Sequence, residues 1–111
     1  MMGNLKNWWK KRRRRSKVGR VIAVESMTAI PAKIGADIYL VRQGDFDKRA
    51  VLDCPCGCKR RIDLNLVRTQ YPVWAVVSKK GSLSLNPSIW LKDDACKSHF
   101  FIKCNKIEWV N

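Results

Sequence analysis

The chain has 111 residues, 46% hydrophobic and 29% charged, so it is long enough for one folded domain with a core and too apolar for general disorder. It contains no run of about 18 apolar residues, and its basic start lacks the apolar core of a signal peptide. These features exclude a membrane-spanning helix and predict a cytoplasmic protein. The formal net charge of +14 favours nucleic acid, an anionic lipid surface or an acidic protein as partner.

Residues 1–17 predict a flexible basic arm. The first 24 residues contain nine of the 23 Lys and Arg residues and none of the acidic ones. Six consecutive cations follow Trp8 and Trp9, which suits single-stranded nucleic acid because bases stack on indoles while cations neutralise phosphates. A membrane surface or a purely solvated leader fits the same composition. The candidate anion-binding residues are Lys10, Lys11, Arg12, Arg13, Arg14 and Arg15.

Short β-type runs separated by turn residues begin at Val18 and predict one domain over residues 18–111. In one of these runs Ile62, Leu64 and Leu66 alternate with polar residues, as in a strand with one buried face. The runs of the first half are 18–27, 36–42, 49–53 and 60–66.

The second half continues the same pattern, which gives about eight strands in an all-β or β-rich fold. Its runs are 73–78, 83–85, 100–103 and 106–110. A break is expected at 86–88, because Pro87 disfavours helical backbone in the residue before it. Cys104 and Asn105 suit a tight hairpin, and segment 88–99 is long enough for one helical turn. The tryptophans expected in the core are Trp74, Trp90 and Trp109.

Five residues form a candidate zinc site. Three cysteines alternate within the stretch CPCGC, and residues two apart in an extended chain point to the same side. A C-x-x-H pair follows later in the chain. An odd number of cysteines in a reducing compartment favours metal binding over a disulfide framework. Zinc takes four ligands, for which we expect Cys56, Cys58, Cys96 and His99, with Cys54 as the alternative ligand.

Zn²⁺ is favoured over an iron–sulfur cluster, which needs four thiolates and would leave the histidine out. A closed four-ligand zinc site stabilises a fold, whereas a catalytic site keeps one position for water. The cysteine-rich set favours a closed site, and neither the H-x-E nor the H-E-x-x-H pattern accompanies it. The acids available as general base in a zinc enzyme have no recognisable offset from a ligand; they are Asp53, Asp63, Asp93, Asp94 and Glu108.

A serine nucleophile is a further alternative, at Ser88 or Ser98. The chain has a single histidine, however, and a histidine that binds zinc does not also serve as the base of a Ser–His pair. Ser88 is therefore expected to cap a turn.

The stretches CPCGC, SLNPSIW and CKSHFFI, followed by IEW, resemble an uncharacterised bacterial family of small cysteine- and histidine-containing proteins. The resemblance covers residues 20–110. Some members of that family lie beside genes for bacterial ubiquitin-like proteins and their conjugating enzymes, which implies a zinc-associated role there and suggests a peptidase acting on such modifiers. Lys59 stands where the family has glycine, and the arginine-rich leader is particular to this chain. The family's motif residues fall on Cys54, Cys56, Cys58, Pro87, Ser88, Cys96 and His99.

Three functional hypotheses follow. The first is a binding or accessory module of a bacterial ubiquitin-like modification pathway, in which Zn²⁺ stabilises the fold and the partner is a ubiquitin-like protein or its conjugating enzymes. The second is a zinc-dependent peptidase or deconjugase of ubiquitin-like proteins. The third is a nucleic-acid-binding protein that uses the basic arm.

Overall fold

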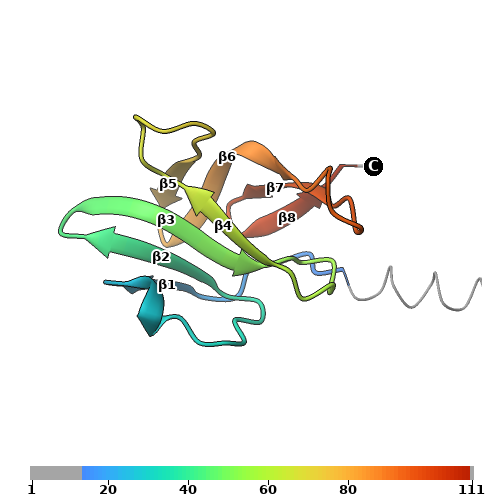
Figure 1. Ribbon diagram of the computed structural model, residues 1–111, viewed down its shortest axis with the longest axis horizontal. Coiled ribbons are helices and arrows are strands. Elements are labelled where there is room, and N and C mark those ends of the chain that lie inside the picture. Colours follow the sequence, from blue (N-terminus) through green and yellow to red (C-terminus); the bar gives the residue numbers. More distant parts are fainter. Residues whose placement is uncertain (1–13, 111) are drawn as a thin grey trace, which may run out of the picture.

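The computed structural model describes residues 14–110, which contain eight β-strands and one short 3₁₀ helix. The strands form two four-stranded sheets (Figure 1). The predicted β-rich fold with about eight strands is confirmed. No helix in this part of the chain is long and apolar enough to cross a membrane. The first sheet contains, in spatial order, β1 (Val21–Val24), β2 (Ile38–Gln43), β3 (Phe46–Asp53) and β4 (Arg61–Asn65). The second contains β5 (Ala75–Lys79), β6 (Ser82–Trp90), β7 (His99–Lys103) and β8 (Lys106–Trp109).

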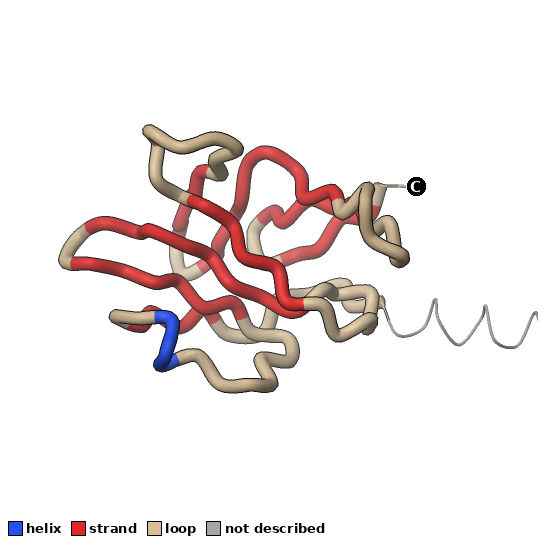
Figure 2. The backbone as a smooth tube through the Cα atoms, in the orientation of Figure 1, coloured by secondary structure: helices blue, strands red, loops and turns tan. Residues whose placement is uncertain are grey.

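Within each sheet, strands adjacent in sequence pair with each other. All pairs are antiparallel except β1 and β2, which are parallel and are joined by a long connection containing the 3₁₀ helix η1 (Met27–Ala29; Figure 2). The predicted hairpin between β7 and β8 is present, and Cys104 and Asn105 at its tip have φ values of 50° and 63°. The alternation in β4 holds as well, because Ile62 and Leu64 are buried between exposed or half-buried neighbours.

The predicted break at 86–88 is wrong, because β6 runs through it. Leu85 pairs with Ile102 and Ile89 pairs with Phe100, so β6 advances four residues while β7 advances two. The two additional residues form a bulge. Bulges of this kind re-aim side chains and are common next to functional sites.

The predicted helical turn in segment 88–99 is also wrong. After β6 the chain makes two consecutive tight turns, in which Asp94 N donates to Leu91 O and Lys97 N donates to Asp94 O. Lys97 has a φ of 48°, which is outside the right-handed helical region. The turns bring the chain back to the start of β7.

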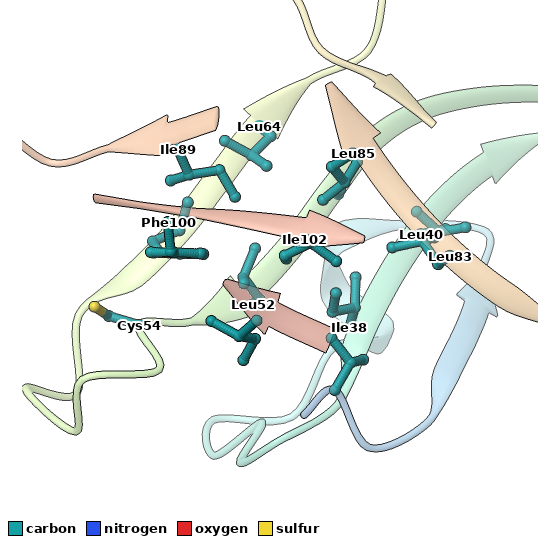
Figure 3. Packing of buried hydrophobic residues seen from close by; sticks show 14 of the residues in the cluster. Ile38, Leu40, Leu52, Cys54, Leu64, Leu83, Leu85, Ile89, Phe100 and Ile102 are labelled. Atoms are coloured by element: carbon teal, nitrogen blue, oxygen red, sulfur yellow. The ribbon is translucent and has the colours of Figure 1, made fainter. Parts of the chain in front are cut away.

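The hydrophobic core lies between the two sheets, which pack face to face (Figure 3). Each sheet contributes alternate residues of its strands, for example Ile38 and Leu52 from the first sheet and Phe100 from the second. A smaller cluster covers the other face of the first sheet, where the β1–β2 connection packs Ile30 and Ile34 against β2 and β3; its other buried members are Val41 and Val51.

Trp90 is not in the core, contrary to the prediction, whereas Trp74 and Trp109 do pack against it. Along β6, Leu83, Leu85 and Ile89 are buried, so Ser84, Ser88 and Trp90, which are their immediate neighbours, belong to the opposite, outer face. Trp90 is 58% exposed there. The outer face of the second sheet is thus the one on which exposed aromatic and polar side chains are available for contact.

We predict that Phe100→Ala lowers the free energy of unfolding by about 3–5 kcal/mol, because the ring is completely buried between the sheets. Urea unfolding followed by far-UV circular dichroism measures the change. Phe46→Ala is the matched control, since that ring is 75% exposed, and it is expected to change the stability by less than about 0.5 kcal/mol. Equal losses in the two variants would contradict the described packing.

Candidate functional site

Four cysteines from two loops converge at one end of the sandwich. Cys54, Cys56 and Cys58 lie in the loop that follows β3, and Cys96 lies in the turns between β6 and β7. Their sulfur atoms all lie within 4.8 Å of one another. Figure 3 shows Cys54 at one end of the core cluster, where β3 leads into the loop. Since one loop belongs to each sheet, a metal ion held by these thiols would cross-link the two sheets.

The backbone of the first loop directs its thiols inward. Cys54 N donates to Arg60 O at 2.8 Å, which closes the loop, and Cys58 N donates to Cys56 Sγ at 3.3 Å. Gly57 and Lys59 have φ values of 92° and 68°. Both values lie in the left-handed region that glycine adopts most easily, which explains why a glycine is also expected at the position of Lys59.

The two cysteine loops also touch through polar groups. Arg60 Nε forms an ion pair with Asp94 at 2.6 Å. Ser98 is buried, and its hydroxyl donates to Cys96 Sγ at 3.3 Å and lies 3.5 Å from Cys54 Sγ. The serine thus lies between thiols of different loops.

Crowding and burial change the acidity of these thiols. Burial raises the pKa of Cys54 well above its usual value, and burial also raises the pKa of Cys58. Burial opposes ionisation of Cys56 too, but hydrogen bonds from Ser98 and the neighbouring cysteines outweigh it and lower the Cys56 pKa to about 7. One thiolate near neutral pH provides the first ligand for a soft cation.

The geometry fits a single tetrahedral ion. Zinc–sulfur bonds of about 2.3 Å in a tetrahedron place the sulfur atoms about 3.8 Å apart. The separation of 3.4 Å between the sulfurs of Cys54 and Cys56 and the upper limit of 4.8 Å for the whole group bracket this value. A multi-iron cluster would interpose iron and sulfide and separate the thiolates further. The four cysteines therefore are able to hold a metal ion.

His99, one of the expected ligands, lies elsewhere. Its Nε2 is 2.9 Å from the hydroxyl oxygen of Ser88. His99 is the first residue of β7 and pairs with Trp90, so Ser88 is its diagonal neighbour on β6. Three of the expected ligands, Cys56, Cys58 and Cys96, thus lie together with the alternative ligand Cys54, while the histidine forms a second candidate site.

Ser88 lies within β6, so the predicted role as a turn cap is wrong. The bulge of β6 ends at this residue, and the indole N–H of Trp74 donates to Ser88 O at 3.3 Å. Trp74 also lines a cavity of about 750 Å³ that extends to Asn86 and to the turn between β2 and β3. Ser88 and His99 are both half-buried, and neither of them lines this cavity.

Four of the five carboxylates considered as general bases have other partners, and the fifth, Asp93, forms no ion pair with a residue of the described range 14–110. Asp53 accepts hydrogen bonds from the backbone N–H groups of Ile34 and Gly35. Asp63 pairs with Arg49, Asp94 with Arg60 and Glu108 with Lys103. None of the acids is within the group of potential metal ligands found among residues 14–110.

Most of the predicted basic arm, including Lys10–Arg13, lies outside the described residues. Arg14 lies 4.3 Å over the ring of Trp109, and Arg15 N donates to Pro55 O in the cysteine loop. Lys17 forms an isolated bridge with Lys106 of β8. The last residues assigned to the arm therefore contact the domain.

A cluster of four thiols and a serine–histidine pair on a β-sandwich define a small β protein with two candidate sites. Residues 26–110 match the family described as "Bacterial ubiquitination-like system serine protease (BubE)", and the chain belongs to this family. The matched region contains both sites. The expected link to bacterial ubiquitin-like systems is thereby confirmed. No curated protein and no solved structure matched the chain.

We predict that the purified protein binds one metal ion per chain with four sulfur neighbours and no nitrogen. Elemental analysis and X-ray absorption spectroscopy measure the stoichiometry and the neighbours. Cys54→Ser is expected to lose or exchange the metal, whereas His99→Ala retains it with unchanged neighbours. Three sulfurs and one nitrogen in the wild type, with the nitrogen lost in His99→Ala, would instead support the ligand set Cys56, Cys58, Cys96 and His99.

Proposed function

We propose that this protein is a serine peptidase of a bacterial ubiquitination-like system, with Ser88 as nucleophile and His99 as general base. The distance of 2.9 Å between Ser88 Oγ and His99 Nε2 is the observation that carries the proposal. A serine hydroxyl is a weak nucleophile until a neighbouring base accepts its proton, and this distance is within the range for that transfer. The description of the family as a serine protease supports the same chemistry.

In the proposed reaction, Ser88 and His99 act together to transfer an acyl group. The proposed reaction requires the Ser88 hydroxyl to donate to Nε2, and hence a neutral ring that carries its proton on Nδ1. As Oγ attacks the carbonyl carbon of the scissile bond, Nε2 takes the hydroxyl proton. His99 then gives this proton to the leaving amine, and an acyl-enzyme ester remains on Ser88. Water hydrolyses the ester with His99 again acting as base.

The family supports a class of substrate. A ubiquitination-like system joins a ubiquitin-like protein to its target through an acyl bond, and a serine peptidase cleaves such bonds. We infer that the chain cleaves a peptide or isopeptide bond at the C-terminus of a ubiquitin-like protein. An accessory role that is limited to binding would need neither the serine hydroxyl nor the imidazole.

The metal in this proposal is structural Zn²⁺, held by Cys54, Cys56, Cys58 and Cys96. Four thiolates fill a tetrahedral site, leave no position for a catalytic water, and suit zinc among the metals that prefer soft ligands. This favours serine chemistry over a zinc-dependent peptidase. When bound, the ion would stabilise the two loops and supply no step of the reaction.

Ser88→Ala is expected to reduce cleavage of a ubiquitin-like protein carrying a C-terminal extension by more than about 10⁴-fold, as loss of the nucleophile does in other serine peptidases. The same substitution should abolish labelling by a fluorophosphonate probe, which intact-mass spectrometry detects. Ser84→Ala is the matched control, since Ser84 lies on the same strand without a histidine partner among residues 14–110. Full activity in Ser88→Ala would show that the proposed nucleophile is wrong.

Removal of the metal with a strong chelator is expected to lower the midpoint of thermal unfolding by at least about 10 °C, because a structural site contributes folding free energy directly. Calorimetry measures the midpoint, and activity should disappear together with the folded state. A metal-free protein that unfolds at the original temperature but has lost its activity would indicate an open catalytic metal instead.

A further inference from the structure

The imidazole of His99 has no acidic partner. In Ser–His–Asp sites a carboxylate holds the histidine in one tautomer and one orientation and stabilises the imidazolium that forms. All nine Asp and Glu residues of this chain lie within residues 14–110, and none of their side chains forms an ion pair or hydrogen bond with His99. Another group must orient the ring if the pair is to react.

Two aromatic rings lie against the imidazole instead. Trp90, directly opposite His99 in the β6–β7 register, stacks on it with ring centroids 4.9 Å apart and an interplanar angle of 14°. Phe101, two residues further along β7, is 6.4 Å away at an angle of 29°. Near-parallel stacking at the shorter distance restricts rotation of the imidazole about its side-chain bonds.

The indole of Trp90 also interacts electrostatically with the imidazole, which an aliphatic side chain does not do. Its face carries negative electrostatic potential and attracts a cation above it. His99 becomes a cation when it accepts the Ser88 proton, so the interaction with Trp90 is stronger in the transition state than in the resting enzyme. Only such a differential interaction speeds the chemical step.

The exposure of Trp90 indicates that the stacking is not a by-product of core packing. The side chain is 58% exposed on the outer face of the second sheet, whereas Trp74 and Trp109 pack against the core. Lys92 Nζ lies 5.9 Å from the centroid of the Trp90 ring. The indole thus has His99 as its aromatic neighbour and otherwise faces the surface.

We propose that Trp90 is a positioning residue that orients His99 by stacking and takes the place of the acidic member of a catalytic triad. The proposal rests on the serine-peptidase function proposed above. Phe101 supports the same ring from the neighbouring position on β7.

The first test compares Trp90→Leu with Trp90→Phe by the second-order rate constant for phosphonylation of Ser88 with a fluorophosphonate probe. Trp90→Leu is expected to react about 100-fold more slowly than the wild type, as a misplaced catalytic group does. Trp90→Phe keeps an aromatic face and is expected to lose only about threefold. Phe46→Leu, on an exposed aromatic residue of the first sheet, is the matched control and should react at the wild-type rate.

The second test observes the ring itself in the resting protein. Because His99 is the single histidine of the chain, its imidazole gives one set of ¹⁵N and ¹H resonances. The wild type and Trp90→Phe are expected to show one tautomer, protonated at Nδ1, with ring protons shifted upfield by the stacked ring. In Trp90→Leu the upfield shift should disappear and the tautomers should mix, while circular dichroism shows an unchanged fold.

Three results would contradict either the positioning role of Trp90 or the peptidase function. Wild-type phosphonylation together with a single tautomer in Trp90→Leu would overturn the positioning role. A raised KM for a protein substrate with unchanged phosphonylation would assign Trp90 to substrate binding and overturn it as well. If the wild type does not react with the probe at all, the peptidase function fails, and the resonances of His99 still decide whether Trp90 orients the ring.

Discussion

The structure depends first on the convergence of four thiols from two loops that belong to different sheets. Between the loops lie the Arg60–Asp94 ion pair and the buried hydroxyl of Ser98, so their relative position is fixed by polar contacts as well as by the sulfur atoms. Cys96 and His99 are three residues apart, and β7 starts at the histidine. The contacts that fix the position of Cys96 therefore also affect the position of the His99 imidazole.

The second constraint is that the outer faces of the two sheets differ in how they are covered. The β1–β2 connection covers the outer face of the first sheet with its own small apolar cluster, whereas the second sheet presents Trp90 and the serine–histidine pair on its outer face. Covering one face adds to the buried area of the sandwich, and no such apolar cluster covers the outer face of the second sheet among residues 14–110. Ser88, at the end of the bulge in β6, lies two residues before Trp90 and therefore diagonally opposite His99.

The sequence allowed most of the fold to be predicted and about half of the candidate site. Strands such as β4 follow from strict alternation, and the β7–β8 hairpin follows from two residues that tolerate a positive φ. The bulge in β6 was not predicted, because a proline such as Pro87 is typical of the end of a strand. Only the register with β7 shows that the strand continues. The cysteines were recognisable by spacing, but the partner of the single histidine was not. The C-x-x-H spacing of Cys96 and His99 is also typical of a metal site. Only the pairing of β6 with β7 shows that His99 lies beside Ser88 on the outer face and outside the group of four thiols.

Under the proposed function, the bulge in β6 places stability and activity in opposition. A strand without Asn86 and Pro87 would match β7 residue for residue, recover regular ladder hydrogen bonds, and place the backbone of Ser88 in a regular position opposite Phe101. Selection for a more robust sandwich would therefore tend to erase this irregularity, and selection for turnover would tend to keep it. On this view the least regular stretch of the second sheet is the part of the fold that an improved scaffold must leave alone.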